Sequence, residues 1–138
     1  MQGPGGPNPS GIPGFNAQYG ITAHAGGGQA QATQLNGWLN TITTVATAAD
    51  SVQLPPGYAG MEVTVINHGA NSCQVFGFQS TVLGDVVTDT IAPVGSAVQG
   101  TVGVALAALA VGLFYCMTGQ SGPSNAIVPA QWQFKLIA

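Results

Sequence analysis

Residues 43–78 read T-T-V-A-T-A-A-D-S-V-Q-L-P-P-G-Y-A-G-M-E-V-T-V-I-N-H-G-A-N-S-C-Q-V-F-G-F. Three runs of β-branched and apolar residues alternate in this stretch with turn residues. The runs are residues 43–47, 61–67 and 73–78. Short β-forming runs at this spacing predict a chain that is built mainly from strands.

The run 61–67 has the clearest strand pattern of the three. Its apolar and polar side chains alternate: Met61, Val63 and Val65 fall on one face, and Glu62 and Thr64 fall on the other. Alternation with a period of two is typical of a strand with one buried face. We therefore expect the first set to face a core and the second set to face outward.

The residues between the runs are strong turn formers. Residues 54–57 are L-P-P-G, and because proline cannot donate a ladder hydrogen bond, no central strand passes through them. Residues 67–71 are N-H-G-A-N, where asparagine and glycine supply the positive-φ positions of a hairpin connection. The simplest prediction is that residues 61–78 form an antiparallel pair of strands.

One short helix is predicted over residues 29–40. Its apolar residues share one helical face; they are Ala32, Leu35, Trp38 and Leu39. Gly37 weakens a helix by about 1 kcal/mol relative to alanine, so we expect this helix to be short.

The second half of the chain contains an apolar run, residues 102–117. Its sixteen residues are fewer than the roughly 20 that a membrane-spanning helix needs, and no basic residue flanks it. A membrane-active role is the weaker alternative. We interpret the run as one or two buried strands, or as a strand with an apolar loop. A strand that is apolar on both faces is expected to be buried on both, with a neighbouring subunit as a candidate cover for one of them. Residues 132–137 predict a last strand, with Trp132, Phe134 and Leu136 on its inward face and Gln133 and Lys135 on the other.

The charge content is unusually low. Lys135 is the only cation, and five charged residues in 138 is 4%, against about 25% in ordinary domains. A free monomer normally stays in solution through a mixed charged surface. We infer that much of this surface is covered by other protein. The alternative is that the many Gln, Asn, Thr and Ser residues suffice.

The same deficit argues against several partners. Nucleic-acid binding needs several Lys or Arg side chains to displace counterions, and attachment to anionic membranes needs a basic patch. With one lysine and a net charge of −3, the chain is expected to bind neither.

Few residues are candidates for chemistry. His68 precedes Cys73 by five residues, but a turn histidine beside a buried strand cysteine is a weak nucleophilic pair. The two cysteines, Cys73 and Cys116, are expected to be reduced and buried, with a disulfide as the alternative. Together with His24 they do not form the close ligand pairs of a zinc site. We expect no catalytic residue, no bound metal and no cofactor.

Two carboxylates, Asp85 and Asp89, lie four residues apart in G-D-V-V-T-D-T. A calcium loop needs a denser set of oxygen ligands and a closing glutamate. We therefore interpret this segment as a polar loop or an edge strand.

Residues 28–78 resemble a segment of small virion proteins of tailed bacteriophages. The shared features are the T-x-V strand, the A-x-D turn, V-x-L-P, V-T-V-I-N-x-G-A-N and Q-V-F, and later D-x-I at residues 89–91 and F-x-C at residues 114–116 followed by Trp132. The similar proteins are capsid decoration (cement) proteins or domains of head and tail fibres. The glycine- and proline-rich start and the apolar residues 95–112 depart from that pattern.

The resemblance implies a structural role without catalytic residues. It implies a protein made in the host cytoplasm that binds the major capsid protein on the outer capsid surface and bridges neighbouring capsomers. The alternative is a head-fibre or tail-fibre domain that binds a host surface. A homotrimer is expected, because a closed ring covers uncharged subunit surfaces and capsid lattices present threefold sites.

The sequence thus predicts two segments. Residues 1–20 form an extended arm, because residues 1–14 contain five glycines and four prolines, and residues 21–138 form one antiparallel β-sandwich or jelly-roll-like domain of seven or eight strands. The alternative for the arm is a disordered tail. The predicted interface consists of apolar residues of the arm and of the segment 102–109: Ile12, Phe15, Tyr19, Val102, Val104, Leu106 and Leu109.

Overall fold

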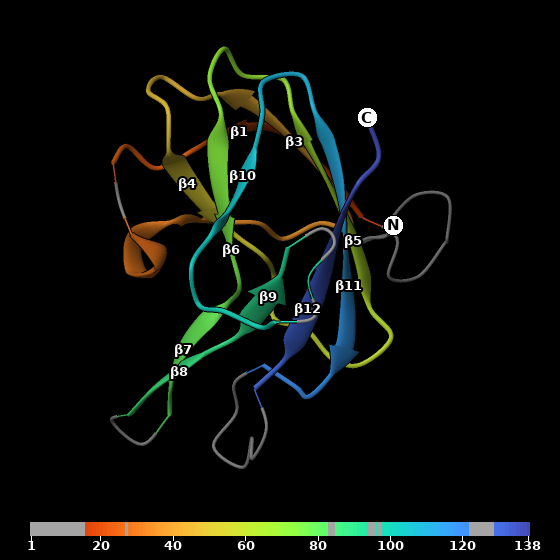
Figure 1. Ribbon diagram of the computed structural model, residues 1–138. Coiled ribbons are helices and arrows are strands. Elements are labelled where there is room, and N and C mark those ends of the chain that lie inside the picture. The colour runs from red at the N-terminus through yellow and green to blue at the C-terminus, as the bar shows by residue number, and fades with distance from the viewer. Residues whose placement is uncertain (1–15, 27, 83–84, 94–95, 97, 122–128) are drawn as a thin grey trace, which may run out of the picture.

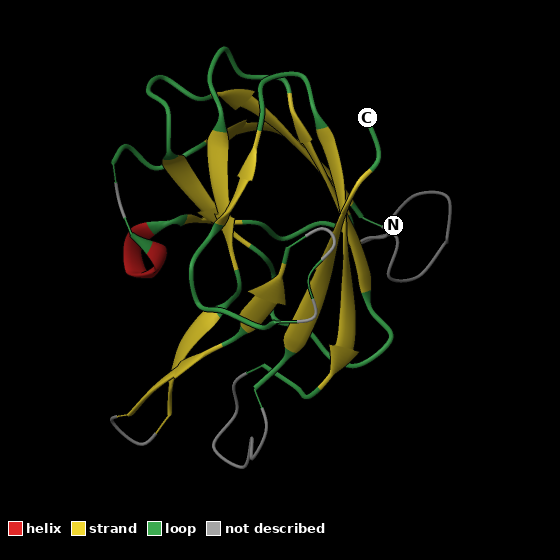
Figure 2. Cartoon of the chain, in the orientation of Figure 1, coloured by secondary structure: helices red, strands yellow, loops and turns green. Residues whose placement is uncertain are grey.

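The computed structural model describes residues 16–26, 28–82, 85–93, 96, 98–121 and 129–138. This part of the chain is built from strands, with one short turn of helix (Figure 2). The strands are β1 (Ala17–Thr22), β2 (Thr33–Gln34), β3 (Leu39–Thr44), β4 (Asp50–Gln53), β5 (Glu62–Asn67), β6 (Cys73–Phe76), β7 (Gln79–Val82), β8 (Asp85–Thr88), β9 (Thr90–Ala92), β10 (Val104–Leu106), β11 (Val111–Thr118) and β12 (Gln131–Leu136). The prediction of a mainly β protein is confirmed.

The strands form two larger sheets and one hairpin (Figure 1). Sheet A has six strands in the order β1-β3-β5-β11-β12-β9, and sheet B has four in the order β10-β6-β4-β2. Among the described residues, strands β7 and β8 pair only with each other. Buried side chains from both sheets belong to one hydrophobic cluster, so the two sheets share a single core.

The first six strands alternate between the two sheets. Strands β1, β3 and β5 are neighbours in sheet A and run parallel, and β2, β4 and β6 are parallel neighbours in sheet B. The chain therefore winds as a coil of three turns, each turn giving one strand to each sheet. The remaining strands close this coil: β11 is antiparallel to β5 and β12, and β10 is antiparallel to β6.

The coil corrects the prediction of an antiparallel fold, because both large sheets are mixed. It also corrects the predicted hairpin over residues 61–78. Strand β5 lies in sheet A and β6 lies in sheet B, so the turn between them leads from one sheet to the other. The buried Asn67 side chain holds this turn: its Oδ1 accepts from Gly69 N–H (2.9 Å), and its Nδ2 donates to the Asn71 carbonyl (2.9 Å).

The predicted helix over residues 29–40 is wrong. Only Gln29–Gln31 form a helical turn, of the 3₁₀ type, and β2 and the start of β3 follow. The backbone N–H groups bond to distant partners: Leu35 N–H donates to the Gln53 carbonyl (2.9 Å), and Trp38 N–H donates to the Asn16 carbonyl (2.8 Å). Pairing with other strands replaces the bonds that a helix would make within itself.

The apolar run 102–117 contains strand β10 and most of strand β11, which agrees with the prediction of two strands. Gly112, Phe114 and Cys116 face the core, whereas Val111, Leu113 and Tyr115 are only half-buried. The prediction of burial on both faces therefore holds for the inner face alone. Within the described residues, no helix is long and apolar enough to cross a membrane.

The core contains three aromatic residues of β11 and β12, namely Phe114, Trp132 and Phe134. The rings of Phe114 and Phe134 stack with their centroids 4.8 Å apart, and Trp132 is fully buried. This confirms the inward face predicted for residues 132–137, except that Leu136 at the end of β12 is 53% exposed. The predicted boundary at residue 20 falls inside β1, whose pairing with β3 places residues 17–20 in sheet A.

Candidate interaction surface

Three of the seven predicted interface residues lie on the surface. Tyr19 is 77% exposed on β1, Val102 is 78% exposed ahead of β10, and Leu109 is 73% exposed between β10 and β11. Leu109 also has a positive φ of 67° in a turn, a conformation that non-glycine residues rarely adopt. Ile12 and Phe15 lie outside the described residues.

The other two predicted interface residues, Val104 and Leu106, are buried in the core. Strand β10 pairs with β6 and has the pattern buried-exposed-buried, so only Ala105 between them faces outward. Their exposed fractions are 7% and 0%. The apolar run therefore contains both core residues and exposed residues. Within β10, the core residues alternate with the exposed Ala105. Leu106 therefore does not belong to the candidate surface, and Val104 reaches it only as part of the lining of a pocket.

The outer face of sheet A carries an apolar strip that the predicted interface residues do not include. Residues that pair across strands lie on the same side of a sheet. Tyr115 pairs with Glu62 and Gln133, Leu113 pairs with Thr64 and Lys135, and Val111 pairs with Ile66. Their neighbours along the strands point into the core, so this set points outward. We call it the outer face; it comprises Glu62, Thr64, Ile66, Val111, Leu113, Tyr115, Gln133 and Lys135.

The outer face is half-buried at its centre and carries charge at its sides. Ile66, Val111, Leu113 and Tyr115 are intermediate in exposure, and Glu62 and Lys135 are exposed. An exposed sheet face usually shows polar residues at alternate positions. The sequence indicates this apolar strip through Val111, Leu113, Tyr115 and Met117, which stand at the alternate positions where an exposed strand face would carry polar residues.

A hollow of about 490 Å³ opens beside this face. It is lined by Trp38, Leu39, Gly60, Glu62 and Thr64. Trp38 is 37% exposed and precedes β3, and the Glu62 carboxylate is at the start of β5. The hollow thus combines an aromatic ring, an apolar side chain and one negative charge.

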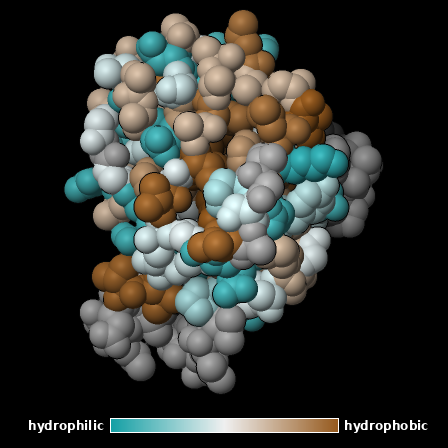
Figure 3. Space-filling model, in the orientation of Figure 1, coloured by the Kyte–Doolittle hydropathy of each residue, from teal (hydrophilic) through white to brown (hydrophobic). Residues whose placement is uncertain are grey.

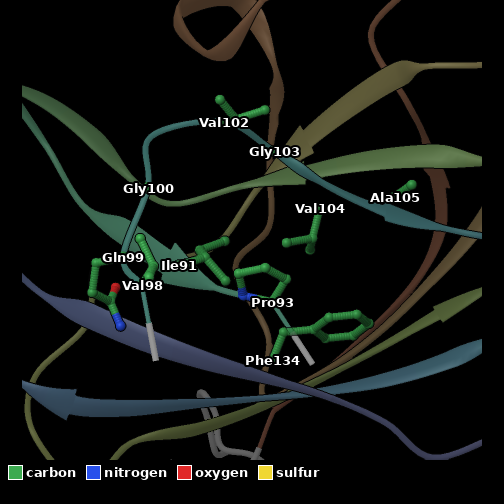
Figure 4. Close-up of a pocket in the computed structure, with 10 residues that line it drawn as sticks. All are labelled: Ile91, Pro93, Val98, Gln99, Gly100, Val102, Gly103, Val104, Ala105 and Phe134. Carbon is green, nitrogen blue, oxygen red and sulfur yellow. The ribbon is translucent and has the colours of Figure 1, made fainter. Parts of the chain in front are cut away.

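A second pocket, of about 480 Å³, lies between the edge strands β9 and β10 (Figure 4). Pro93, Val104 and Phe134 project toward the same space, and the exposed Val98 and Val102 are at its rim. Its lining is nearly all apolar, with one polar side chain, Gln99. Such a lining suits an apolar side chain of a partner and offers no group for acid–base chemistry.

The residues considered for chemistry are not brought together. His68 is exposed, whereas Cys73 is buried, and burial, with the nearby Asp50 carboxylate, raises the pKa of the Cys73 thiol to about 12. Burial also raises the pKa of Cys116, to about 11. Both cysteines are free, buried thiols, as predicted, and both are protonated at neutral pH. Among the described residues, no three His, Cys, Asp or Glu side chains gather to hold a metal ion.

Asp89 is buried and joins three loops. Its carboxylate accepts hydrogen bonds from the Ser121 hydroxyl and from Ala130 N–H (3.1 Å), and the Ser121 oxygen accepts from Gly57 N–H (2.7 Å). Burial raises the pKa of Asp89, and the bonds from Ser121 and Ala130 and the nearby Trp132 partly offset this rise. Asp85 is the first residue of β8. The interpretation of this segment as a polar loop or an edge strand did not include the buried hydrogen bonds by which Asp89 joins the loops.

Comparison with protein-family models, with curated proteins and with solved structures found no match to this chain.

Proposed function

We propose that this protein is a capsid decoration (cement) protein of a tailed bacteriophage. In this proposal it binds the major capsid protein on the outer surface of the virion, bridges neighbouring capsomers and stabilises the head. It acts as a homotrimer and takes no cofactor. The fold class proposed with it is a β-sandwich or jelly-roll, supported by two sheets that share one core.

The observation that carries the proposal is apolar exposure combined with very low charge. Large hydrophobic side chains are exposed on several elements; they are Tyr19, Trp38, Leu39, Tyr58, Val86, Val98, Val102, Leu109, Met117, Leu136 and Ile137. Figure 3 shows hydrophobic areas spread among hydrophilic ones over the side in view. With only five charged residues in the chain, a surface of this kind is suited to contact with other protein.

The resemblance of residues 28–78 to virion proteins supports the phage setting. The physical mechanism would be burial of apolar area across joints between capsomers. At about 25 cal/mol per Å² of apolar surface, an interface of about 1,600 Å² has ample gross stabilisation before the costs of association. Such an interface needs shape and apolar area, and it needs few charges.

The test is binding of the purified full chain to undecorated capsids that are assembled from the major capsid protein encoded by the same genome. We expect saturable binding and a higher temperature of capsid disruption. Val102→Gln is expected to weaken binding, and Thr118→Gln, at an exposed polar position outside the exposed hydrophobic set, is the control. Absence of capsid binding together with binding to host cells would favour the fibre alternative.

A further inference from the structure

The outer face of sheet A has an apolar centre on its central strands. Strand β11 lies between β5 and β12, and its outward side chains are Val111, Leu113 and Tyr115. Central strands have both of their backbone edges paired, so nothing more is to be gained there by strand addition. Only the side chains of this face remain for contact with another protein.

The two strands beside β11 carry opposite charges on this face. Glu62 on β5 pairs with Tyr115, and Lys135 on β12 pairs with Leu113, so the two charged side chains lie on either side of the apolar strip. Neighbouring strands are about 5 Å apart, which places the charged strands about 10 Å from each other. Lys135 is the only cation of the chain, and no ion pair forms between it and Glu62 in the described part of the molecule.

The Glu62 side of the face also has a place for a long cationic side chain. Glu62 lines the hollow of about 490 Å³ together with Trp38 and Thr64. An ammonium group there would meet a carboxylate and an indole ring, which attracts cations to its face. The aliphatic part of a lysine side chain would lie against Leu39, which also lines the hollow.

We propose that the outer face of sheet A joins copies of this chain in a closed trimer, in which Lys135 of each copy enters the hollow beside Glu62 of the next. Three sheet faces around one axis place β11 of each copy nearest the axis and β12 of one copy beside β5 of the next. Each copy then uses its positive side once and its negative side once, which is the requirement for a closed ring. This inference rests on the homotrimer in the proposed function and names the surface that forms it.

The test is charge exchange on the full chain, followed by light scattering. We expect the natural chain to have a mass of about 41 kDa, three times the 13.8 kDa of one chain. Lys135→Glu makes both sides of the face negative, and Glu62→Lys makes both sides positive. The trimer of each single variant is therefore expected to dissociate at a protein concentration at least about tenfold higher than that at which the natural trimer dissociates. The double variant Glu62→Lys with Lys135→Glu restores opposite charges and is expected to recover the trimer.

Two controls keep the result interpretable. Val86→Glu adds a negative charge on the β7–β8 hairpin, outside the face, and should leave the trimer intact. Lys135→Gln and Glu62→Gln remove charge without repulsion and should weaken the trimer less than the exchanges do. Circular dichroism melts show whether each variant is folded; the charged residues are exposed, so the fold should persist.

Trimers that are unaffected by both single exchanges, a double variant that stays dissociated, or a natural chain that is a monomer or dimer would each overturn the proposal. Capsid binding, measured separately, distinguishes this failure from failure of the proposed function. A monomer that binds capsids keeps the decoration role and removes this face. A trimer that follows the charge exchange but does not bind capsids keeps the face and removes the decoration role.

Discussion

The buried side chain of Asn67 donates a hydrogen bond of 2.9 Å to the backbone carbonyl of Leu106. Asn67 is the last residue of β5 in sheet A, and Leu106 is the last residue of β10 in sheet B. The same amide group donates to the Ala107 carbonyl at 3.2 Å. One side chain therefore ties the two sheets together where the chain crosses between them.

Replacing Asn67 by alanine should lower the free energy of unfolding by about 3 kcal/mol, because buried backbone groups lose their partners. The measurement is urea denaturation followed by circular dichroism. His68→Ala, at the exposed neighbouring position, should change the free energy of unfolding by less than about 0.5 kcal/mol. Equal effects of the two substitutions would contradict the role given to the Asn67 amide.

Gly57 lies directly against the indole ring of Trp132. A β-carbon at position 57 would overlap the ring, which is fully buried and has no room to move. Gly57→Ala should therefore lower the free energy of unfolding by about 1–3 kcal/mol. Gly28→Ala is the matched control, because a β-carbon there meets nothing within 4 Å. Thermal melting of both variants makes the comparison, and a melting temperature of Gly57→Ala equal to that of the control would refute it.

Asp89 should make the protein less stable as pH rises. Its pKa in the folded protein lies above the ordinary value of 3.8 because of burial, so the folded state holds the proton more tightly than the unfolded state. This contribution is fully present below pH 3.8 and is lost as pH rises through the higher folded pKa. Asp89→Asn replaces the titrating carboxyl group by an amide, so the variant lacks this pH-dependent contribution. The free energy of unfolding of the variant relative to that of the natural chain should therefore increase with pH over that window. Denaturation curves at a series of pH values test this, and a constant difference would contradict it.

The two cysteines should be unreactive in the folded protein. Both thiols are buried, and their pKa values of about 12 and about 11 leave almost no thiolate at pH 8. A thiol-reactive disulfide reagent should label neither residue in the native state and both after denaturation. Cys116→Ser should leave one residue to label after denaturation. Rapid labelling of the native protein at pH 8 would show that the thiols are accessible.

Part of the fold could be predicted from local pattern. Met61, Val63 and Val65 alternate with polar residues, and all three are buried as predicted, because the two faces of a strand have different surroundings. The sheet that the next strand joins could not be predicted. Asn67 and Gly69 mark a change of direction, but whether the chain pairs back or crosses to a second sheet depends on the distant β10.

Only part of the candidate surface could be predicted, because local pattern does not show which apolar residues face the core. The exposed Val102 and the buried Val104 lie two residues apart in one apolar run, and only the pairing of β10 with β6 shows which of them faces the core. The outer face needs the register of three strands, because Glu62 and Lys135 come from distant parts of the sequence. The helix prediction failed at Leu35 and Trp38, because their backbone groups find partners in distant segments.

The three-turn coil also determines when the chain can fold. Ala17 pairs with Leu39, and Leu39 pairs with Thr64, so each parallel neighbour is reached only after a long loop has closed. Folding dominated by such non-local pairs occurs in about milliseconds to seconds. Strand β5 also needs β11, which itself pairs with β12 near the end of the sequence. Sheet A can therefore be completed only after a ribosome has released the strands from β1 to β12, so the early strand β5 waits during synthesis for its later partner β11.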